Sequence, residues 1–398
     1  MEKLNGLACV ILLYTKDYGY TLAVNSKKPV YGIGPTLLSA GVMSFAILGD
    51  ALIYVVLPVN AAVFGITIFW VGVLLAANRI VRIFTLGPIA LLAQRTSPRN
   101  LAIVGAVTST ISTLIYGLGE GPTILLAARL LWGLSFATLT LVIFSYALSD
   151  RTKAGTNMGW SRAIHSIGPS LVLLIGPWAA VEVGPKNIFI CLGIISGLGL
   201  PIAFLLPKEG RKIRPRKNRW FPKPKKFDLF LLTIGLTVDG IFAIGITLTI
   251  AQTSSVGTAM ITGGVLIGLR RVMEALLSPV GGILGDHFGS ERLLLISTVV
   301  LVIGFTLLAT GLAFIGGTLV VVARALIAVL WPVEIARRTQ DDETIHRLAV
   351  GQTWRDVGAA AGPLMLGSII SVVSLSHIYW FTTAIVLISL ILQRSNHD

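Results

Sequence analysis

Ten ionisable side chains lie inside stretches of the sequence that are otherwise apolar, and they are the residues best placed to do chemistry. They are Asp50, Arg79, Arg82, Arg129, Arg162, His165, Asp239, Arg271, Glu274 and Arg324. A charge among apolar side chains is costly unless it meets an opposite charge, a hydrogen-bond partner or water. The sequence therefore predicts buried ion pairs, a polar cavity, or both.

Asp50 and Arg129 form the best-matched pair. Asp50 precedes Pro58 by eight residues, and Arg129 follows Pro122 by seven. At a rise of about 1.5 Å per residue, both would lie roughly 10 to 12 Å from the same end of their helices. Protonation of a carboxylate beside arginine would free the guanidinium. We predict a proton-responsive pair, with a static ion pair that fixes helix packing as the alternative.

Asp239 and Arg324 would repeat this arrangement later in the chain. Arg271 and Glu274 are three residues apart, close enough on a helix to pair with each other. His165 is a candidate proton carrier, because an unperturbed imidazole titrates at about pH 6.5; a packed or interfacial histidine is the alternative. The predicted proton- or ion-coupling residues are thus Asp50, Asp239, Glu274 and His165.

Arginines outnumber carboxylates among these positions by six to three. Guanidinium binds carboxylate and phosphate groups through two parallel hydrogen bonds, so an excess of arginine favours an anionic solute. The predicted substrate or ion-pair residues are Arg79, Arg129, Arg271 and Arg324. Some of them could instead extend toward the membrane surface.

The composition places these residues in a membrane protein. Of the 398 residues, 54% are hydrophobic and only 13% are charged, whereas soluble domains carry about 25% charged residues. Apolar runs of about 20 residues recur along the whole chain, each long enough to cross a bilayer as a helix. We predict an all-α membrane protein with twelve transmembrane helices.

The twelve predicted spans fall into two sets of six. The first set is Pro35–Pro58, Thr67–Ala93, Leu101–Gly117, Pro122–Leu148, Gly159–Val181 and Asn187–Leu206. The second set is Leu229–Gln252, Met260–Gly285, Leu293–Leu312, Thr318–Pro332, Gln352–Ser374 and Ser376–Gln393. The expected domains are a segment of unclear role at 1–34, bundles at 35–206 and 229–393, a basic linker at 207–228 and a tail at 394–398.

Basic residues are concentrated in alternate connections between the spans. One side holds Arg95, Arg99, Arg151, Lys153, Arg292, Arg337, Arg338, Arg347 and the cluster in 208–226, whereas the other holds only Lys186. Such an excess marks the cytoplasmic side. Both termini and the linker are expected there, in a plasma membrane such as a bacterial inner membrane.

The net charge of +14 is therefore interpreted as a topology signal, and no nucleic acid is expected as a partner. The expected partners are a small-molecule substrate and the lipid bilayer. The basic linker at 208–226 could also contact anionic lipid headgroups, which attract juxtamembrane basic clusters.

The two halves of the chain match each other internally. Equivalent positions are Gly72 and Gly264, Arg79 and Arg271, Trp160 and Trp354, Arg129 and Arg324, and Asp50 and Asp239. Repeated membrane halves usually place a substrate site between them and rock around it. A duplicated six-helix unit therefore indicates a transporter.

Two motifs resemble those of the major facilitator superfamily. Gly282 to Arg292 resembles its signature loop after the second helix of a half, and Ala128 to Gly133 resembles its fourth-helix arginine-glycine motif. The resemblance covers about Pro35 to Gln393 and implies two pseudo-symmetric six-helix bundles that work by alternating access. Proton-coupled members of the superfamily also imply the proton-responsive role for Asp50.

The resemblance also implies a gate built from these loops. Asp286 would face the N-terminus of a helix near Gly159 in the other half, where the helix dipole favours negative charge. Glycines allow close approach of helices and loops. The predicted gating residues are Gly282, Gly285, Asp286, Gly289, Arg292, Gln94 and Arg95. Because Gln94 stands where the superfamily has aspartate, we expect an asymmetric gate.

The sequence contains no phosphate-binding glycine loop, nucleophile elbow or metal-spaced cluster, so no enzyme, cofactor, metal site or ATP-driven pump is expected. We predict a monomeric secondary transporter that moves a small organic solute, anionic or drug-like, by alternating access with proton coupling. The alternatives are an uncoupled facilitator of the same fold, and a transporter-fold protein that acts as a receptor or assembly factor.

Overall fold

The structure is a computed structural model that describes residues 31–208, 223–242, 245, 256–340, 343–370 and 372–394. All regular elements within these ranges are helices. The predicted roles of the N-terminal segment and of most of the basic linker, including its contact with lipid headgroups, lie outside the described residues.

Each of the twelve predicted spans overlaps helical residues of the described part of the chain, and most of the seventh span after Phe242 lies outside that part. The first half contains α2 (Ile33–Ala46), α3 (Leu48–Val59), η1 (Ala61–Phe64), α4 (Ile68–Ala93), α5 (Pro98–Leu118), α6 (Pro122–Ala147), α7 (Ala154–Val183), α8 (Asn187–Gly197) and α9 (Gly199–Phe204). The second half contains α10 (Lys226–Ile234), η2 (Gly235–Phe242), α12 (Val256–Phe288), α13 (Ser290–Ala309), α14 (Ala313–Arg338), α15 (Thr344–Ile369) and α16 (Leu375–Arg394).

Eight helices among the described residues are long and apolar enough to cross a membrane. They include the six segments of the first half, with α2 and α3 counted together, and α13 and α14 of the second. The all-helical fold class is therefore confirmed, while the count of twelve transmembrane helices stays a prediction.

Several helices extend further than the sequence predicted. α7 begins at Ala154 rather than Gly159, α14 continues past Pro332 to Arg338, and α15 begins at Thr344 rather than Gln352. The predicted boundaries stopped at glycine, proline and charged residues. Helices continue through such residues near their ends because exposed termini and basic side chains in the last turn are tolerated there.

The first helix of each half is interrupted close to its carboxylate. Ile47 separates α2 from α3, and Asp50 lies in the first turn of α3. In the second half, η2 is a π-helical segment that contains Asp239. π-Helical turns are rare in proteins, and those that occur are often found at functional sites. Hydropathy alone could not predict the irregular backbone at these two places.

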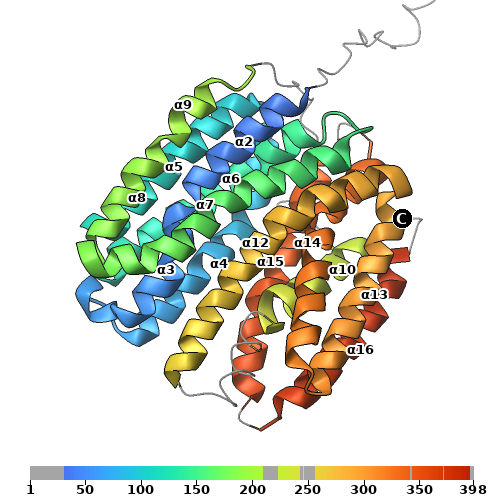
Figure 1. The fold of residues 1–398 in the computed structure, drawn as a ribbon. Helices are drawn as coiled ribbons and strands as arrows, with labels where there is room; N and C mark the ends of the chain where they lie inside the picture. The colour runs from blue at the N-terminus through green and yellow to red at the C-terminus, as the bar shows by residue number, and fades with distance from the viewer. Residues whose placement is uncertain are drawn as a thin grey trace, which may run out of the picture.

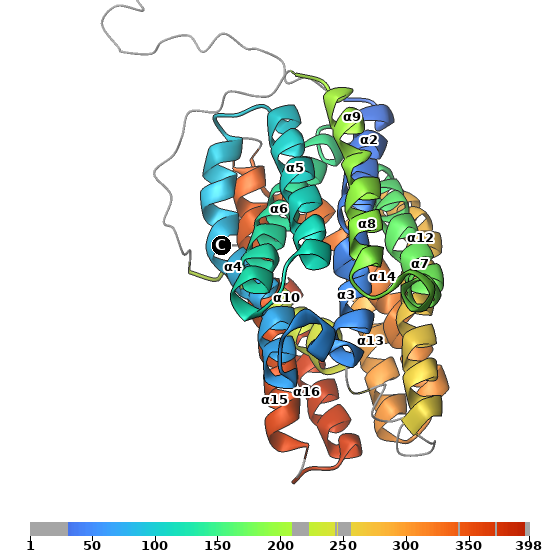
Figure 2. The ribbon, with the colours of Figure 1, turned by 90° about the vertical axis from the view of Figure 1, so that its left-hand side faces the viewer.

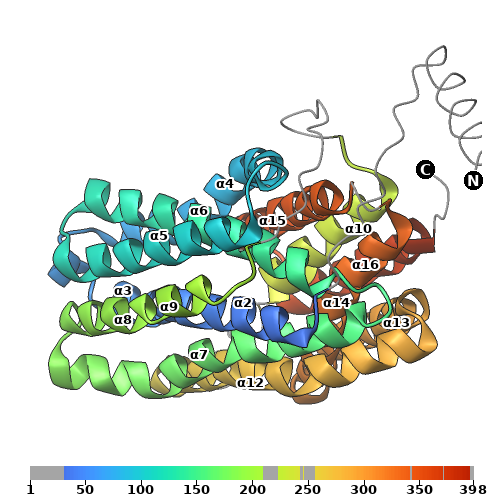
Figure 3. The ribbon, with the colours of Figure 1, turned by 90° about the horizontal axis from the view of Figure 1, so that it is seen from above.

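The helices form two bundles that lie side by side. Figure 1 and Figure 2 show the blue-to-green helices of the first half grouped apart from the yellow-to-red helices of the second. Figure 3 shows α7 beside α12 on one edge of the interface and α4 beside α15 on the other. We call these two lines of contact the α7–α12 seam and the α4–α15 seam.

Chain direction gives the molecule two ends. The connections α4–α5, α6–α7, α12–α13 and α14–α15 lie at one end, where α9 ends and α10 begins; we call it the linker face. The opposite end holds the connections α5–α6, α7–α8 and α13–α14.

A buried ion pair joins two helices at the linker face. Asp228, in the first turn of α10, is fully buried and accepts a hydrogen bond from the Lys225 backbone amide at 2.9 Å. Arg347 of α15 donates to both carboxylate oxygens of Asp228 at 3.1 Å each. The prediction that placed Arg347 in a connection is therefore wrong, because α15 starts earlier.

Replacing Arg347 with alanine should lower the free energy of unfolding by about 3–5 kcal/mol, because it leaves a buried carboxylate without its charged partner. Thermal unfolding of the detergent-purified protein measures the loss. The double variant Arg347→Ala/Asp228→Asn should recover part of it. An unchanged unfolding temperature for the single variant would contradict the analysis.

Candidate functional site

A cavity of about 730 Å³ lies between the two bundles, within the range of small-molecule sites, about 300–1,000 Å³. Residues of both halves line it. The charged lining residues are Asp50, Arg79, Arg82, Arg162, Asp239, Arg270, Arg271, Glu274, Arg324, Arg355 and Asp356. Seven arginines thus face four carboxylates, an excess of arginine among the charged residues that line the cavity.

The predicted Asp50–Arg129 pair forms at the wall of this cavity. Arg129 is fully buried, and its Nη1 donates to Asp50 Oδ1 at 2.5 Å. Its Nε donates to the Leu74 carbonyl at 2.9 Å, and its remaining nitrogen contacts are the hydroxyls of Tyr54 and Tyr116 at 3.3 and 3.4 Å. Asp50 therefore reaches the cavity while Arg129 is held behind it.

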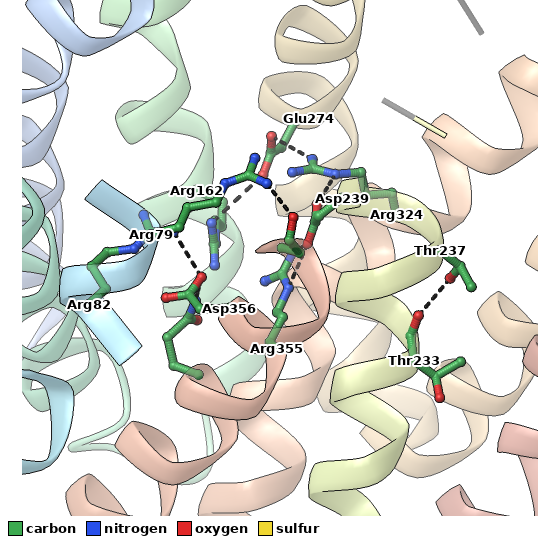
Figure 4. Close-up of polar contacts among 12 residues, drawn as sticks. Arg79, Arg82, Arg162, Thr233, Thr237, Asp239, Glu274, Arg324, Arg355 and Asp356 are labelled. Atoms are coloured by element: carbon green, nitrogen blue, oxygen red, sulfur yellow. Dashed lines mark hydrogen bonds and ion pairs between the residues drawn. The ribbon is translucent and has the colours of Figure 1, made fainter. Parts of the chain in front are cut away.

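The second half carries a larger cluster around Asp239, which we call the C-half cluster: Asp239, Glu274, Arg324 and Arg355. Arg324 donates to Asp239 at 2.9 Å and to Glu274 at 3.1 Å, and Arg355 Nη2 lies 2.8 Å from Asp239 (Figure 4). The predicted Asp239–Arg324 pair therefore forms.

The predicted Arg271–Glu274 pair is present but weak. The nearest nitrogen-to-oxygen distance between them is 3.7 Å, too long for a hydrogen bond. Glu274 is buried and its closest cation is Arg324, not its neighbour on α12. The predicted intrahelical ion pair of Arg271 with Glu274 is therefore present, but Arg324 is the closer partner of Glu274.

Arg79 and Arg82 reach across the α4–α15 seam, with both side chains leaving the same face of α4 (Figure 4). Arg79 Nη1 donates to the Ala359 carbonyl at 2.5 Å. Arg82 Nη2 donates to Asp356 Oδ1 at 2.9 Å, and Gln352 also donates to that oxygen at 3.2 Å. These contacts tie the two halves together beside the cavity.

His165 also lines the cavity from α7. It is buried, and its Nε2 has no hydrogen-bond partner among the described residues. One turn earlier, Arg162 lies 3.8 Å from Glu274 across the α7–α12 seam. Arg162 and His165 of the first half thus line the cavity beside the C-half cluster.

The predicted gating aspartate caps a helix of the opposite half. Asp286, near the end of α12, accepts hydrogen bonds from the backbone amides of Gly155 and Thr156 at 2.8 and 2.7 Å. These amides belong to the first turn of α7, where the helix dipole favours an anion. The capped residues lie slightly earlier than Gly159, because α7 starts at Ala154.

Glycines make this contact possible. A Cβ on Gly282 would lie 2.1 Å from the Gly155 carbonyl oxygen, and one on Gly159 would lie 2.4 Å from the Ser278 carbonyl oxygen. Gly289 links α12 to α13 with a φ of 89°, a conformation that favours glycine. Gly285 packs close to Leu330.

The equivalent loop of the first half makes no such cap with any residue that the structure describes. Gln94 is buried and its Oε1 has no hydrogen-bond partner in the described part of the chain. Arg95 and Arg292 are exposed. The linker-face contact built on Asp286 is therefore one-sided, as the replacement of aspartate by glutamine predicted.

Three charged lining residues were missed by the sequence analysis: Arg270, Arg355 and Asp356. Arg270 directly precedes Arg271, and the other two lie inside the eleventh predicted span. The criterion that found Asp50 and Arg129, an ionisable residue within an apolar segment, applies equally to them.

Replacing Asp286 with alanine should open the linker face in a larger fraction of molecules. Two charge-assisted hydrogen bonds disappear, and each is worth about 1.5–3 kcal/mol. Spin labels at exposed Asn100 and Gln340, one in each half, should report longer and broader distances. Glu291→Ala in the same loop is the control, since the ion pair of Glu291 is with Arg338 of its own half. Identical distance distributions in both variants would contradict the role of Asp286.

Comparison of the sequence with known proteins finds one matching family and two relatives. Residues 39–238 match the Major Facilitator Superfamily. The "Probable nitrate transporter NarT" of Staphylococcus epidermidis is 23% identical over 68% of this chain and 72% of its own length. "Multidrug resistance protein 2" of Bacillus subtilis is 28% identical over 46% of this chain and 41% of its own length.

Solved structures show the same fold. The human organic anion transporter MFSD10 (TETRAN) superposes with a TM-score of 0.74 at 13% identity, over 91% of this chain and 99% of that one. A bacterial homologue of the iron transporter ferroportin, in an outward-facing state, gives 0.67 at 14% identity, over 91% and 98%. The chain therefore belongs to the Major Facilitator Superfamily, and it is a membrane transporter rather than an enzyme.

Proposed function

We propose that this transporter moves a small organic anion across the bilayer by alternating access, coupled to the proton gradient. The observation that carries the proposal is the cavity between the halves, where seven arginines face four carboxylates. An excess of buried positive charge is costly when the cavity holds no anion. Binding of an anionic solute offsets that cost, and guanidinium groups suit carboxylate and phosphate in particular.

The two seams support alternating access. The α7–α12 seam joins the halves on the linker-face side of the cavity through Asp286 and glycine contacts, and the α4–α15 seam joins them beside the cavity through Arg79 and Arg82. By the positive-inside rule the linker face is cytoplasmic. The chain would then be a multi-pass plasma-membrane protein, closed toward the cytoplasm in this conformation, with two six-helix units that rock as a monomer.

The Asp50–Arg129 pair is the proposed proton-coupling site. The Asp50 side chain is 14% exposed, whereas the Arg129 side chain is fully buried, so a proton from the cavity reaches the carboxylate first. Protonation would leave Arg129 with only carbonyl and hydroxyl partners. Because a buried charge without a counter-ion is unfavourable, the proton would change the packing between α3 and α6.

The names of two relatives support an anionic solute. One is named for nitrate and another for organic anions, whereas the other two are named for multidrug resistance and for iron. The cavity of about 730 Å³ offers far more room than an inorganic ion needs, which favours an organic anion. An uncoupled facilitator with the same cavity, in which the charged pairs are structural, is the second candidate.

The test uses proteoliposomes that contain purified protein and a pH-sensitive dye, to which organic anions are added one at a time. The wild-type protein should give anion-dependent proton flux, and Asp50→Asn should reduce that flux at least tenfold while still binding the anion. Glu120→Gln is the matched control, because Glu120 is an exposed carboxylate that pairs with Lys186 away from the cavity.

Each other outcome changes the proposal in a defined way. Equal flux in Asp50→Asn and wild type would remove the role of Asp50. Anion movement without proton flux would favour the facilitator. Movement of organic cations and not anions would overturn the anion proposal, and binding of a protein partner with no solute movement would favour a receptor or assembly factor.

A further inference from the structure

Three guanidinium groups in the cavity have no hydrogen bond to any described residue. They belong to Arg162 of α7 and to Arg270 and Arg271 of α12; we call them the arginine triad. Arg162 and Arg271 approach only Glu274, at 3.8 and 3.7 Å. The Nε of Arg270 is buried and has no partner in the described part of the chain.

Glu274 cannot satisfy this triad. Its Oε2 already accepts a hydrogen bond from Arg324 at 3.1 Å, and the carboxylate is only 2% exposed. The buried Nε of Arg270 loses hydration and gains no hydrogen bond to a described residue in return. Within the described part of the chain, the triad therefore presents N–H groups without acceptors to the cavity.

The local charge balance is strongly positive. The triad together with Arg324 and Arg355 amounts to five guanidiniums, and the two carboxylates among them are Asp239 and Glu274. A bound group with one negative charge would leave two positive charges without a counter-charge, and a group with two negative charges would leave one. A group with two charges, and at least three oxygens, gives each member of the triad an acceptor.

The large apolar side chains of the cavity come mostly from the first half. They are Met43, Ile47, Phe136, Ile143, Phe144 and Met158. Among the described residues, the second half contributes few apolar side chains larger than alanine, namely Pro363 and Leu364. The cavity therefore offers apolar surface mainly on the first half, beside the arginines that both halves contribute.

We infer that the substrate is an amphiphilic organic dianion, with its doubly charged oxyanion group at the arginine triad and its apolar body against the first half. The oxyanion can be a phosphate monoester or a pair of carboxylates, since both supply two charges and three or more oxygens. This inference rests on the proposed anion transport and adds the charge, the shape and the binding residues of the solute.

A set of benzene derivatives tests the charge of the ligand while the size of its apolar ring stays the same. Phenyl phosphate, phthalate, benzoate and benzyl alcohol share the ring and differ in charge. At pH 8 phenyl phosphate is a dianion, since the second pKa of a phosphate monoester is about 6. Calorimetry on the full-length protein in detergent should show both dianions binding at least about tenfold more tightly than benzoate, with no detectable binding of benzyl alcohol.

Single substitutions locate the charged group. Arg270→Gln and Arg271→Gln should each weaken phenyl phosphate binding about tenfold and change benzoate binding by less than threefold. Arg271→Lys keeps the charge but not the planar donors, so it should give an intermediate loss. Arg99→Gln is the control, because Arg99 lies outside the cavity, over the ring of Phe204. The unliganded unfolding temperature of each variant verifies folding.

The results separate this inference from the proposed function. Tight binding of phenyl phosphate alone, or of phthalate alone, would support a dianion and identify which kind. Equal affinities for benzoate and both dianions would overturn the inference, while benzoate transport would leave the proposed function standing. Unchanged affinities in both arginine variants would also overturn it. Binding of benzyl alcohol but of no anion would contradict both the dianion inference and the proposed anion transport.

Discussion

A charged side chain in the middle of a membrane protein must have a partner, and this constraint determines how the helices of this transporter pack. Arg129 has no exposed surface, and its nitrogens reach Asp50, the Leu74 carbonyl and two tyrosine hydroxyls. Those acceptors lie on α3, α4 and α5. One guanidinium on α6 therefore fixes the relative positions of four helices in the first half, because moving any of them would leave a buried donor unsatisfied.

The same constraint operates differently in the second half. Arg324 connects α14 to Asp239 in η2 and to Glu274 in α12. Arg355 of α15 adds a further contact to Asp239. The carboxylates here are shared between several arginines, so the network has more donors than acceptors. The first half thus has a closed pair, and the second half has an open cluster that faces the cavity.

The sequence predicted the segments and the best-matched pairs for physical reasons. Hydropathy defines which residues enter a bilayer, and depth along a helix follows from a fixed rise per residue. Asp50 and Arg129 could be paired on depth alone, and Asp239 with Arg324 by the internal repeat. The helix break at Ile47 and the π-helical turns of η2 could not be predicted, since neither contains a proline and both depend on packing.

Contacts across the seams were harder to predict than contacts within a half. Depth says nothing about which face of a helix meets the other bundle, so Arg82 could not be assigned to Asp356 from sequence. Glu274 was assigned to Arg271 because three residues on one helix are always close, whereas the folded chain brings a better-placed cation from α14. The spacing of residues along one helix is known from the sequence, whereas the contacts between different helices are not.

The internal repeat relates the two seams, but the acidic and the basic residue of one ion pair exchange places between them. Arg82 and Glu274 lie three residues after the equivalent Arg79 and Arg271, and Arg162 and Asp356 lie two residues after the equivalent tryptophans. The pair Arg162–Glu274 on one seam therefore corresponds to Asp356–Arg82 on the other, with the charges exchanged.

The two equivalent pairs do not contribute equally. The Arg82–Asp356 distance is 2.9 Å, whereas Arg162 and Glu274 are 3.8 Å apart. The α7–α12 seam has glycine contacts and the Asp286 cap in addition, and these do not depend on charge in the cavity. The α4–α15 seam relies on guanidinium groups that also line the cavity. Since Coulomb interactions are strong in a poorly hydrated site, an anion in the cavity acts on guanidinium groups of both seams, but only the α7–α12 seam also keeps contacts that are independent of it.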